Sequence, residues 1–238
     1  MIFEYFRRNR PLVSLIMPAY NAERFISQAI ESVCKQRYKN WELIIVDDSS
    51  IDKTKEIIDV LAKQESRIKV LKNEKNQGIA KARNRALRNA SGEFIGHLDA
   101  DDMLKKNALS TMVKEFSRNN VSLLYSGFVA IDDQNKSIKK CLASEFEREK
   151  IAEIGWQHFG MYKKDAALAV GGFNEKLITC SDGDLFVRIA RKFPCQRVKK
   201  YLYFYRWHGK NIGRSRPHCL DCSKKKVCNY FKEWTNTN

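Results

Sequence analysis

Three short polar clusters in the chain each follow an apolar run, and each holds groups that can bind a charged ligand. The last of them is Asp99-Ala100-Asp101-Asp102, in which two carboxylates two positions apart can present oxygens to one hard cation. A cation held in this way can neutralise the oxygens of a diphosphate. Because Asp is also common in ordinary turns, the cluster alone leaves metal binding and a plain turn as open interpretations.

The other two clusters are Asp47-Asp48-Ser49-Ser50 and Pro18-Ala19-Tyr20-Asn21. An acid at the end of a strand is well placed to accept hydrogen bonds from a ribose or from a base N–H. Ser and Asp at the start of a helix also act as caps, so we expect some of these residues to do so. Further along, Arg83 with its neighbours Lys81 and Arg85 either counters a diphosphate or forms an exposed helix face.

The elements around these clusters alternate between strand and helix. Apolar runs predict strands at 13–17 (halted by Pro18), 41–46, 68–71 and 93–98. Helical spacing of apolar residues predicts helices at 22–36, 54–62 and 79–89. Such an alternation is typical of a parallel sheet with right-handed crossovers. Ligands of open α/β sheets bind at the carboxyl ends of the strands, so we expect the three clusters to converge on one edge.

The second half of the chain alternates less regularly. It predicts helices at 107–118 and 181–192, strands at 121–131, 155–162 and 198–205, a polar turn at 132–140, and a helix or ordered loop at 145–154. The fold class that we predict is α/β, a single domain with a mostly parallel central sheet and helices on both faces. This domain spans residues 1–213, and a basic, Cys-containing tail follows at 214–238.

The composition excludes several classes of protein. The chain has 238 residues, of which 43% are hydrophobic and 11% aromatic, so it is neither disordered nor collagen-like. Its 44 Lys and Arg outnumber 28 Asp and Glu. Most of this surplus lies in residues 185–238, with fourteen basic and two acidic side chains. Such a segment suits nucleic acid, anionic lipid or a phosphate-bearing ligand, or it is a solvated surface.

Neither a membrane span nor a signal peptide is evident in the sequence. The strongest apolar run, at 43–46, has four residues, whereas a span needs about 20. Seven cysteines fit reduced thiols better than a disulfide framework. The sequence therefore predicts a soluble, cytoplasmic protein. Cys219, Cys222 and Cys228 follow His218 at spacings that leave structural zinc and free thiols as alternatives.

Taken together, these segments resemble the family-2 glycosyltransferases with the GT-A (Rossmann-like) fold. The strand-Pro-x-Tyr-Asn start, the V-D-D-S-S turn, the G-x-x-x-A-R-N segment and the D-x-D-D element occur in family order, over a donor half at 13–104. In an acceptor half at 105–213, Gly-Gly-Phe-Asn-Glu at 171–175, Ser-Asp-Gly-Asp at 181–184 and Tyr-Arg-Trp-His-Gly at 205–209 also match.

The resemblance implies a role for each matching residue. Pro18 and Tyr20 would line the nucleobase pocket, and Asp48 would bond the base. Arg83 would lie near the nucleotide, and Asp99 would contact the ribose or the sugar. Asp101 would bind the metal, His208 would reach the metal or the diphosphate, and Asp182 would be the catalytic base. The family usually has Glu at the position of Ser181, which affects how the substrate is positioned.

A second resemblance concerns the segment 156–161, Trp-Gln-His-Phe-Gly-Met. It is similar to the chondroitin- and hyaluronan-polymerase-like members of the family, in which aromatic and His side chains would stack on an acceptor sugar. A core strand with an aromatic stripe is the alternative. Those polymerases carry two transferase modules and this chain has room for one, so we expect the addition of a single sugar.

The predicted function is that of an inverting glycosyltransferase. It would use Mn²⁺ or Mg²⁺ and move one sugar from a UDP-sugar to a saccharide or lipid-linked acceptor, in the cytoplasm near the anionic inner face of a membrane. Arg206, Lys210 or Arg214 could then meet the diphosphate. Alternatives are a nucleotide-sugar-binding protein without transfer activity and a nucleic-acid-binding protein that uses the basic C-terminal segment. A nucleotidyltransferase would need a Gly-rich phosphate loop after the first strand, and residues 18–21 lack one.

Overall fold

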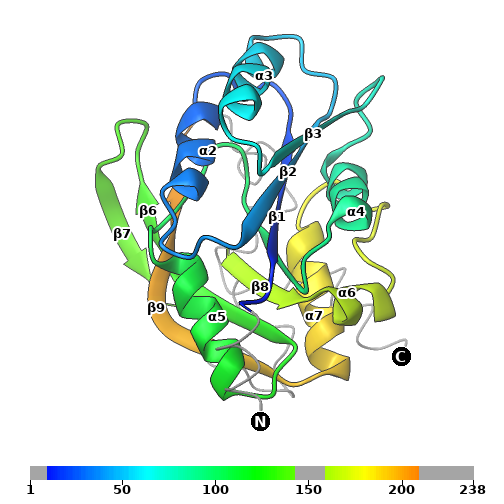
Figure 1. Ribbon diagram of the computed structural model, residues 1–238, viewed down its shortest axis with the longest axis vertical. Helices are drawn as coiled ribbons and strands as arrows, with labels where there is room; N and C mark the ends of the chain where they lie inside the picture. The colour runs from blue at the N-terminus through cyan, green and yellow to red at the C-terminus, as the bar shows by residue number, and fades with distance from the viewer. Residues whose placement is uncertain (1–9, 143–158, 209–238) are drawn as a thin grey trace.

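The computed structural model describes residues 10–142 and 159–208. Figure 1 shows the strands of one curled sheet with helices packed on both of its faces. The strands are β1 (Val13–Ala19), β2 (Trp41–Asp47), β3 (Ile68–Lys72), β4 (Phe94–His97), β5 (Met103–Leu104), β6 (Leu123–Ile131), β7 (Ser137–Cys141), β8 (Phe159–Lys163) and β9 (Cys195–Arg206). The helices are α2 (Ile26–Cys34), α3 (Thr54–Gln64), α4 (Ile79–Asn89), α5 (Ala108–Arg118), α6 (Lys164–Ala169) and α7 (Ser181–Lys192).

The sheet joins a parallel half to a mixed half. Its order is β3-β2-β1-β4-β8-β6-β9-β5, with β7 paired to β6. The four strands β3, β2, β1 and β4 run parallel, as the alternation of strands and helices predicts. The strand β8 joins β4 to β6 through antiparallel pairs, and β9 pairs with β6 in parallel. The predicted fold class, an α/β domain with helices on both faces of a mostly parallel sheet, is confirmed.

Two apolar layers flank the sheet. One contains the buried faces of α2 and α5, with Phe94, Met161 and Tyr203 from the strands. The other contains the buried faces of α4, α6 and α7, with Ile95 and Tyr162 from the strands. Because neighbouring residues of a strand point to opposite faces, β4 contributes Phe94 to the first layer and Ile95 to the second. The two layers fix the helices that carry the polar side chains described below.

The first strand runs through Pro18, where the sequence predicted its end. In β1, the Ile16 carbonyl accepts from Leu98 on the β4 side, and the Ala19 carbonyl accepts from Asp48 on the β2 side. Pro18 therefore faces the β4 side, where the pairing of β1 with β4 has already ended at Ile16. A proline costs the ladder nothing at such a position, because its missing N–H would have had no partner there.

The segment predicted as a polar turn at 132–140 is a tight turn followed by a strand. The Asp132 carboxylate accepts from the backbone N–H groups of Gln134 and Lys136, and this closes the turn. The strand β7 then pairs with β6. Its side chains are exposed, so their polarity concealed the strand in the sequence. The helix α6 was not predicted, and the predicted helix or loop at 145–154 lies outside the described residues.

Within 10–142 and 159–208, no helix is both long enough and apolar enough to cross a membrane.

Candidate active site

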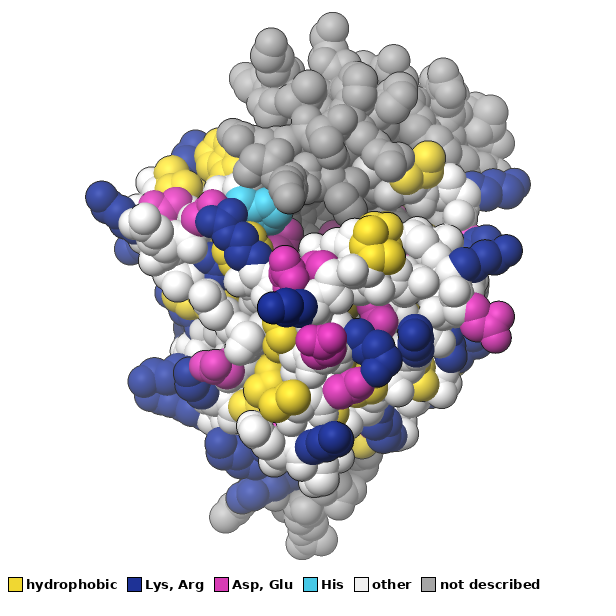
Figure 2. Space-filling model, turned by 90° about the horizontal axis from the view of Figure 1, so that it is seen from above, with side chains coloured by type: hydrophobic (Ala, Val, Ile, Leu, Met, Phe, Trp, Pro, Cys, Tyr) yellow, Lys and Arg dark blue, Asp and Glu magenta, His cyan; other side chains and the backbone are white. Residues whose placement is uncertain are grey.

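The polar clusters that follow β1, β2 and β4 lie together, because these three strands are parallel neighbours in the sheet. The loops after β1 and β2 are tied to each other by hydrogen bonds. The Asn21 side chain accepts from the Ile51 N–H at 2.9 Å, and the Thr54 hydroxyl accepts from the Ala22 N–H at 2.7 Å. Figure 2 looks down on this end of the molecule and shows acidic side chains beside a histidine ring. The predicted convergence on one edge is confirmed for these loops.

Asp48 is buried at the end of β2 and orders the loop that leads into α4. Its Oδ1 accepts from Asn73 Nδ2 at 2.6 Å and from the Gln77 N–H at 3.0 Å, and its Oδ2 accepts from the Gly78 N–H at 2.8 Å. Gly78 has φ 90°, a left-handed conformation that glycine adopts at little cost. The carboxylate therefore shapes the wall of this loop, and a contact with a base remains a proposal.

Pro18 and Tyr20, the residues expected at a nucleobase pocket, flank the end of β1. Pro18 is buried, whereas 48% of Tyr20 is exposed. An aromatic ring exposed beside an ordered loop is available to stack on a planar ligand. The two residues lie together at the end of β1, and their contact with a nucleobase stays a prediction.

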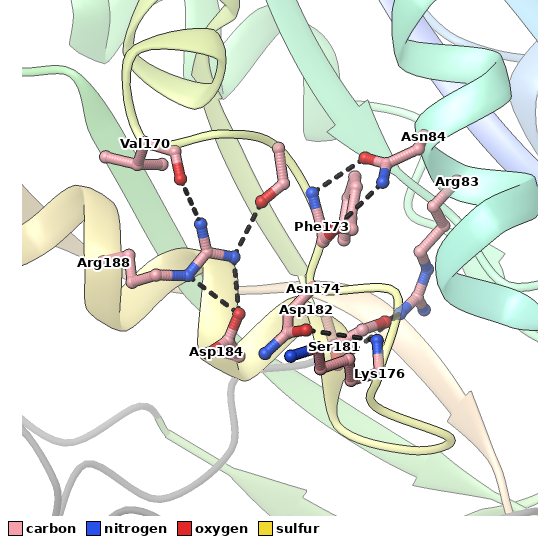
Figure 3. Close-up of polar contacts among 11 residues, drawn as sticks. Arg83, Asn84, Val170, Phe173, Asn174, Lys176, Ser181, Asp182, Asp184 and Arg188 are labelled. Atoms are coloured by element: carbon pink, nitrogen blue, oxygen red, sulfur yellow. Dashed lines mark hydrogen bonds and ion pairs between the residues drawn. The ribbon is translucent and has the colours of Figure 1, made fainter. Parts of the chain in front are cut away.

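Arg83 is a buried cation that links the donor half of the chain to α7. Its Nη2 donates to Asp99 Oδ1 at 2.7 Å, and its Nη1 donates to the Ser181 hydroxyl at 2.9 Å. The same Nη1 lies 3.6 Å from Asp182 Oδ1. Figure 3 shows the guanidinium reaching from α4 toward the start of α7. Arg83 thus joins two other predicted site residues, Asp99 and the candidate base Asp182.

The charge of Arg83 is balanced by two carboxylates. Burial lowers the pKa of Arg83, but the negative charges of Asp99 and Asp182 outweigh that effect, and the net result is a raised pKa. The guanidinium is therefore permanently charged in this setting. Its neighbours Lys81 and Arg85 do not share the role. Arg85 donates to the Lys72 carbonyl and to Asn73, and Lys81 is exposed.

The start of α7 is held in place by two polar clamps on the loop that precedes it (Figure 3). Asn84 of α4 donates to the Phe173 carbonyl at 2.8 Å and accepts from the Phe173 N–H at 2.8 Å. Arg188 donates to the carbonyls of Val170 and Gly172, at 2.6 and 2.7 Å, and pairs with Asp184. These clamps fix the Gly-Gly-Phe segment against both helices, and they thereby fix the position of Asp182.

Asp182 lies in the first turn of α7 with 20% of its side chain exposed. Its Oδ1 faces Arg83, and its Oδ2 lies 3.9 Å from His97 Nε2. A carboxylate that is partly open to solvent and held from behind suits a general base, which must be within reach of the proton that it removes. The arrangement agrees with the role that the resemblance implies for Asp182.

Asp101 and His208, the predicted metal-binding pair, are in direct contact. The imidazole Nε2 lies 2.9 Å from Asp101 Oδ2, although the two residues are 107 positions apart. Two adjacent ligands of an octahedral ion at about 2.1 Å would lie about 3 Å apart, so this spacing fits Mg²⁺ or Mn²⁺. Among the described residues, no group of three His, Cys, Asp or Glu side chains could hold a metal. Phosphate oxygens and water usually complete such a site.

Arg206, which the sequence offered as a cation for the diphosphate, is instead buried and bonded to groups of the protein. Its side chain is fully buried and donates to the Asp101 carbonyl at 2.9 Å, to the Asp132 carbonyl at 3.1 Å and to Gln28 Oε1 at 2.9 Å. The guanidinium therefore fastens the end of β9 to the D-x-D turn. Because His208 follows two residues later, these hydrogen bonds of Arg206 place the imidazole next to Asp101. Lys210 and Arg214 lie outside the described residues.

Two more residues support the D-x-D turn, and the sequence did not single them out. The buried Asp102 accepts from the Arg206 N–H at 2.7 Å and from the Tyr203 hydroxyl. Burial, together with the like charges of Asp101 and Asp99, raises the pKa of Asp102 well above its usual range. The Tyr203 hydroxyl in turn accepts from the Asp99 N–H at 3.3 Å. In the sequence, the acids at the end of a buried strand were a signal that could have identified Asp102 as a supporting residue. No sequence signal identified Tyr203.

Comparison with known proteins gives the family. The model of the family described as "Glycosyl transferase family 2" matches residues 14–175. The chain belongs to glycosyltransferase family 2. This result confirms the resemblance seen in the D-x-D-D and G-x-x-x-A-R-N motifs, and it includes the elements that carry Arg83, Asp99 and Asp101.

Named relatives of this family 2 chain act on lipid-linked and polysaccharide substrates. It is 46% identical over 134 residues to the Escherichia coli protein "UDP-Glc:alpha-D-GlcNAc-diphosphoundecaprenol beta-1,3-glucosyltransferase WfgD", covering 56% of this chain and 52% of that protein. It is 31% identical over 225 residues to the chondroitin synthase of Escherichia coli, covering 93% of this chain and 32% of the synthase. The chain thus spans about half or less of the length of these two relatives.

Solved structures confirm the fold of this family 2 chain. The structure titled "Crystal structure of S. aureus TarS 1-349 in complex with UDP-GlcNAc" superimposes with a TM-score of 0.74 at 22% identity, over 90% of this chain and 64% of that one. The Pyrobaculum calidifontis mannosyltransferase PcManGT, in complex with GDP-Man and Mn²⁺, gives 0.67 at 19% identity, over 87% and 60%. At these identities the likeness establishes the fold, and the residue roles rest on this chain.

Several sequence-based expectations lie partly or wholly outside the described residues. They include the domain boundary at 213/214, the tail with Cys219, Cys222 and Cys228, and Trp156 to His158 of the aromatic segment. Phe159 and Met161 of that segment are fully buried in the layer of α2 and α5, so for these two residues the core-strand interpretation is correct.

Proposed function

We propose that this chain is an inverting, metal-dependent hexosyltransferase that moves one sugar from a UDP-sugar to a hydroxyl of a polysaccharide or glycolipid precursor. The observation that carries the proposal is the Arg83 bridge, because one buried cation meets Asp99 of the D-x-D turn and lies 3.6 Å from Asp182. Through this bridge, Asp99, which is expected near the donor sugar, and Asp182, the candidate base, both lie beside the charge of Arg83.

The donor class rests on the relatives and on the geometry of the strand ends. WfgD is named for UDP-Glc, and TarS was solved with UDP-GlcNAc. In this chain, Tyr20 would stack on the base and Pro18 would line its pocket, while Asp48 and the loop that it orders would meet the uracil edge. Asp99, held by Arg83, would contact the ribose or the sugar. Asp101 and His208 would hold Mn²⁺ or Mg²⁺, which offsets charge on the departing diphosphate.

The chemical step would need one base and one displacement. Asp182 would take the proton of the acceptor hydroxyl as its oxygen attacks the anomeric carbon, and the bond from that carbon to the diphosphate would break. A single base that faces the donor implies in-line attack and therefore inversion. Arg83 would steady the carboxylate of Asp182 and would add positive charge near the leaving group.

The acceptor class and the place of action are also proposals. WfgD is named for a diphosphoundecaprenol acceptor, and chondroitin synthase for a polysaccharide. A lipid-linked acceptor would bring this chain to an anionic membrane surface from the cytoplasmic side, where the basic residues after 185 would favour contact.

The experiment that tests the proposal is a thermal-shift panel of nucleotide sugars with and without Mn²⁺, followed by product analysis with the best donor. A ligand that binds only the native state raises the melting temperature. We expect a UDP-sugar with Mn²⁺ to give the largest shift, and we expect a product of inverted configuration on a lipid-diphosphate sugar. A panel in which no UDP-sugar shifts the melting temperature would refute the donor assignment.

A further inference from the structure

His97 is a buried polar side chain in a mostly apolar layer of the core. It ends β4 with 1% of its surface exposed, and it shares the sheet face of Ile95 rather than that of Phe94. The apolar strand side chains on that face include Ile16, Ile44, Val46, Ile95, Leu123 and Tyr162. Placing an imidazole among them costs free energy unless its nitrogens find polar groups, so its presence calls for a function.

Among the described residues, a polar group that faces His97 is the carboxylate of the candidate base. Its Nε2 lies 3.9 Å from Asp182 Oδ2, and its ring packs on Phe186 with the ring centroids 5.2 Å apart. Asp182 and Phe186 are four positions apart in α7, so both project from the same face of that helix. One histidine therefore contacts the base through its nitrogen and the helix of the base through its ring.

The neighbouring strand is adapted to this contact. Gly160 of β8 lies directly beneath Phe186, and a Cβ at that position would lie 2.3 Å from the Phe186 Cζ atom. Any larger residue at this position would displace the Phe186 ring from its packed position. The absence of a side chain at Gly160 lets Phe186 lie close to the sheet. This close packing sets the distance of α7 from the sheet, and therefore the distance of Asp182 from His97.

Charged and titratable groups surround Asp182 from four elements. Arg83 of α4 lies 3.6 Å from Oδ1, Ser181 of α7 is its chain neighbour, and His97 of β4 faces Oδ2. Tyr162 of β8 is fully buried within electrostatic range. Burial raises the pKa of Tyr162, and the charge of Asp182 adds to that effect while Arg83 opposes it. Tyr162 is therefore a neutral phenol, and of the groups named here Arg83 faces Oδ1 and His97 faces Oδ2.

We propose that His97 is a positioning residue that holds Oδ2 of Asp182 and so fixes the orientation in which this carboxylate meets the acceptor hydroxyl. The inference rests on the proposed function of Asp182 as the base. Arg83 and His97 face the two carboxylate oxygens at 3.6 and 3.9 Å, which is ion-pair range and longer than a hydrogen bond, so a small side-chain rotation on acceptor binding would bring His97 close enough to donate to Oδ2. A base that is oriented before the acceptor arrives loses less entropy in the transition state.

The test compares His97→Met with His97→Gln. The two replacements have nearly the same length and both remove the ring from Phe186, but only Gln keeps an N–H donor. We expect Met to lower kcat by about ten- to a hundredfold with little change in the donor KM, and Gln to recover most of that loss. Equal kcat values for the two variants would overturn the proposal, since a packing role alone would affect both alike.

The pH profile of kcat adds a readout that packing would not move. A hydrogen-bond donor beside a carboxylate stabilises its charged form. In His97→Met the acid limb of the profile is therefore expected at higher pH than in the parent, and in His97→Gln it should return toward the parent position. An acid limb at the same pH in all three proteins contradicts the proposed contact.

A measurement without substrate separates this inference from the proposed transferase function. The chain has four histidines, so the ring ¹⁵N signals of His97 are assignable by comparison with His97→Gln. We expect Asp182→Asn to shift these signals, whereas the control Asp165→Asn, on the exposed first turn of α6, should not. Unchanged His97 signals in Asp182→Asn would overturn the inference whatever the chain transfers. A shift together with an inactive parent protein would locate the failure in the proposed function.

Discussion

The hydroxyl of Ser181 accepts a hydrogen bond from Nη1 of Arg83 at 2.9 Å across 98 positions of the chain. Both side chains are buried, so a neutral group accepts a hydrogen bond from a buried cation whose charge is balanced by Asp99 and Asp182. Ser181 therefore does not compete with Asp182 for the charge of Arg83. A carboxylate at position 181 would do so.

This arrangement predicts that two substitutions of Ser181 affect different properties, one mainly stability and the other mainly kcat. Ser181→Ala leaves Nη1 short of a partner and should lower the free energy of unfolding by about 1 to 3 kcal/mol. Ser181→Glu supplies a third carboxylate, which should draw Arg83 away from Asp182 and lower kcat more than it lowers stability. Chemical denaturation and steady-state kinetics on both variants check this. Stability in Ser181→Ala equal to that of the parent would show that the hydrogen bond contributes nothing.

The contact of Asp101 with His208 predicts metal-linked donor binding. Asp101→Asn keeps the size of the side chain but removes its charge, so UDP should bind equally with and without Mn²⁺ in this variant. Calorimetric titration of UDP measures the difference, and Asp59→Asn on the surface of α3 is the control, because Asp59 pairs with Lys55 on the same helix. If Asp101→Asn kept the full gain in affinity from Mn²⁺, the ion would have to bind elsewhere.

The close approach of Phe186 to Gly160 predicts a coupled pair of substitutions. Gly160→Ala should destabilise the fold by about 1 to 3 kcal/mol, because the new methyl group overlaps the Phe186 ring. Adding Phe186→Leu should recover part of that loss, since a smaller side chain makes room for the methyl. A double-mutant cycle by thermal or urea denaturation measures the coupling energy. Strict additivity of the two changes would contradict the predicted overlap.

Glu42, at the opposite end of the sheet, predicts a pH dependence of stability that is unrelated to the site. Burial raises its pKa, but bonds from Lys69, Ser14 and the Ser91 N–H outweigh burial and lower it. A depressed folded-state pKa gives stability that is complete above the ordinary value of 4.5 and is lost as the pH falls through the lowered value. Glu42→Gln should cost about 2 kcal/mol at pH 7 and flatten the urea-denaturation profile below pH 4.5. A parallel profile in the variant would exclude this origin.

The elements of the donor half were predictable because their signals are local. Continuous apolar runs mark β1, β2 and β4, and helical spacing places α4 at its exact bounds. The acids at the strand ends followed from the topology. The strand β7 was missed since it is an exposed edge strand, and polar residues there look the same as a turn.

The side-chain links within the site were not predictable in the same way. Arg206 looked like an available surface cation, yet backbone carbonyls bury and satisfy it. His97 lies inside an apolar run, where a histidine looks like a core residue. The contacts of Arg83 with Ser181 and of His208 with Asp101 join segments about a hundred positions apart. Such pairs depend on the packing of α4, α7 and β9, which no local pattern specifies.

The most direct test of the account is the rate of sugar transfer by Asp182→Asn, measured beside its affinity for the UDP-sugar. Asn keeps the shape of the side chain but cannot take a proton, so we predict unchanged donor affinity and a loss of kcat of about a hundredfold or more. Asp165→Asn serves as the matched control and should transfer at the parent rate. Transfer by Asp182→Asn at the parent rate would contradict the assignment of Asp182 as the base, and with it the central claim.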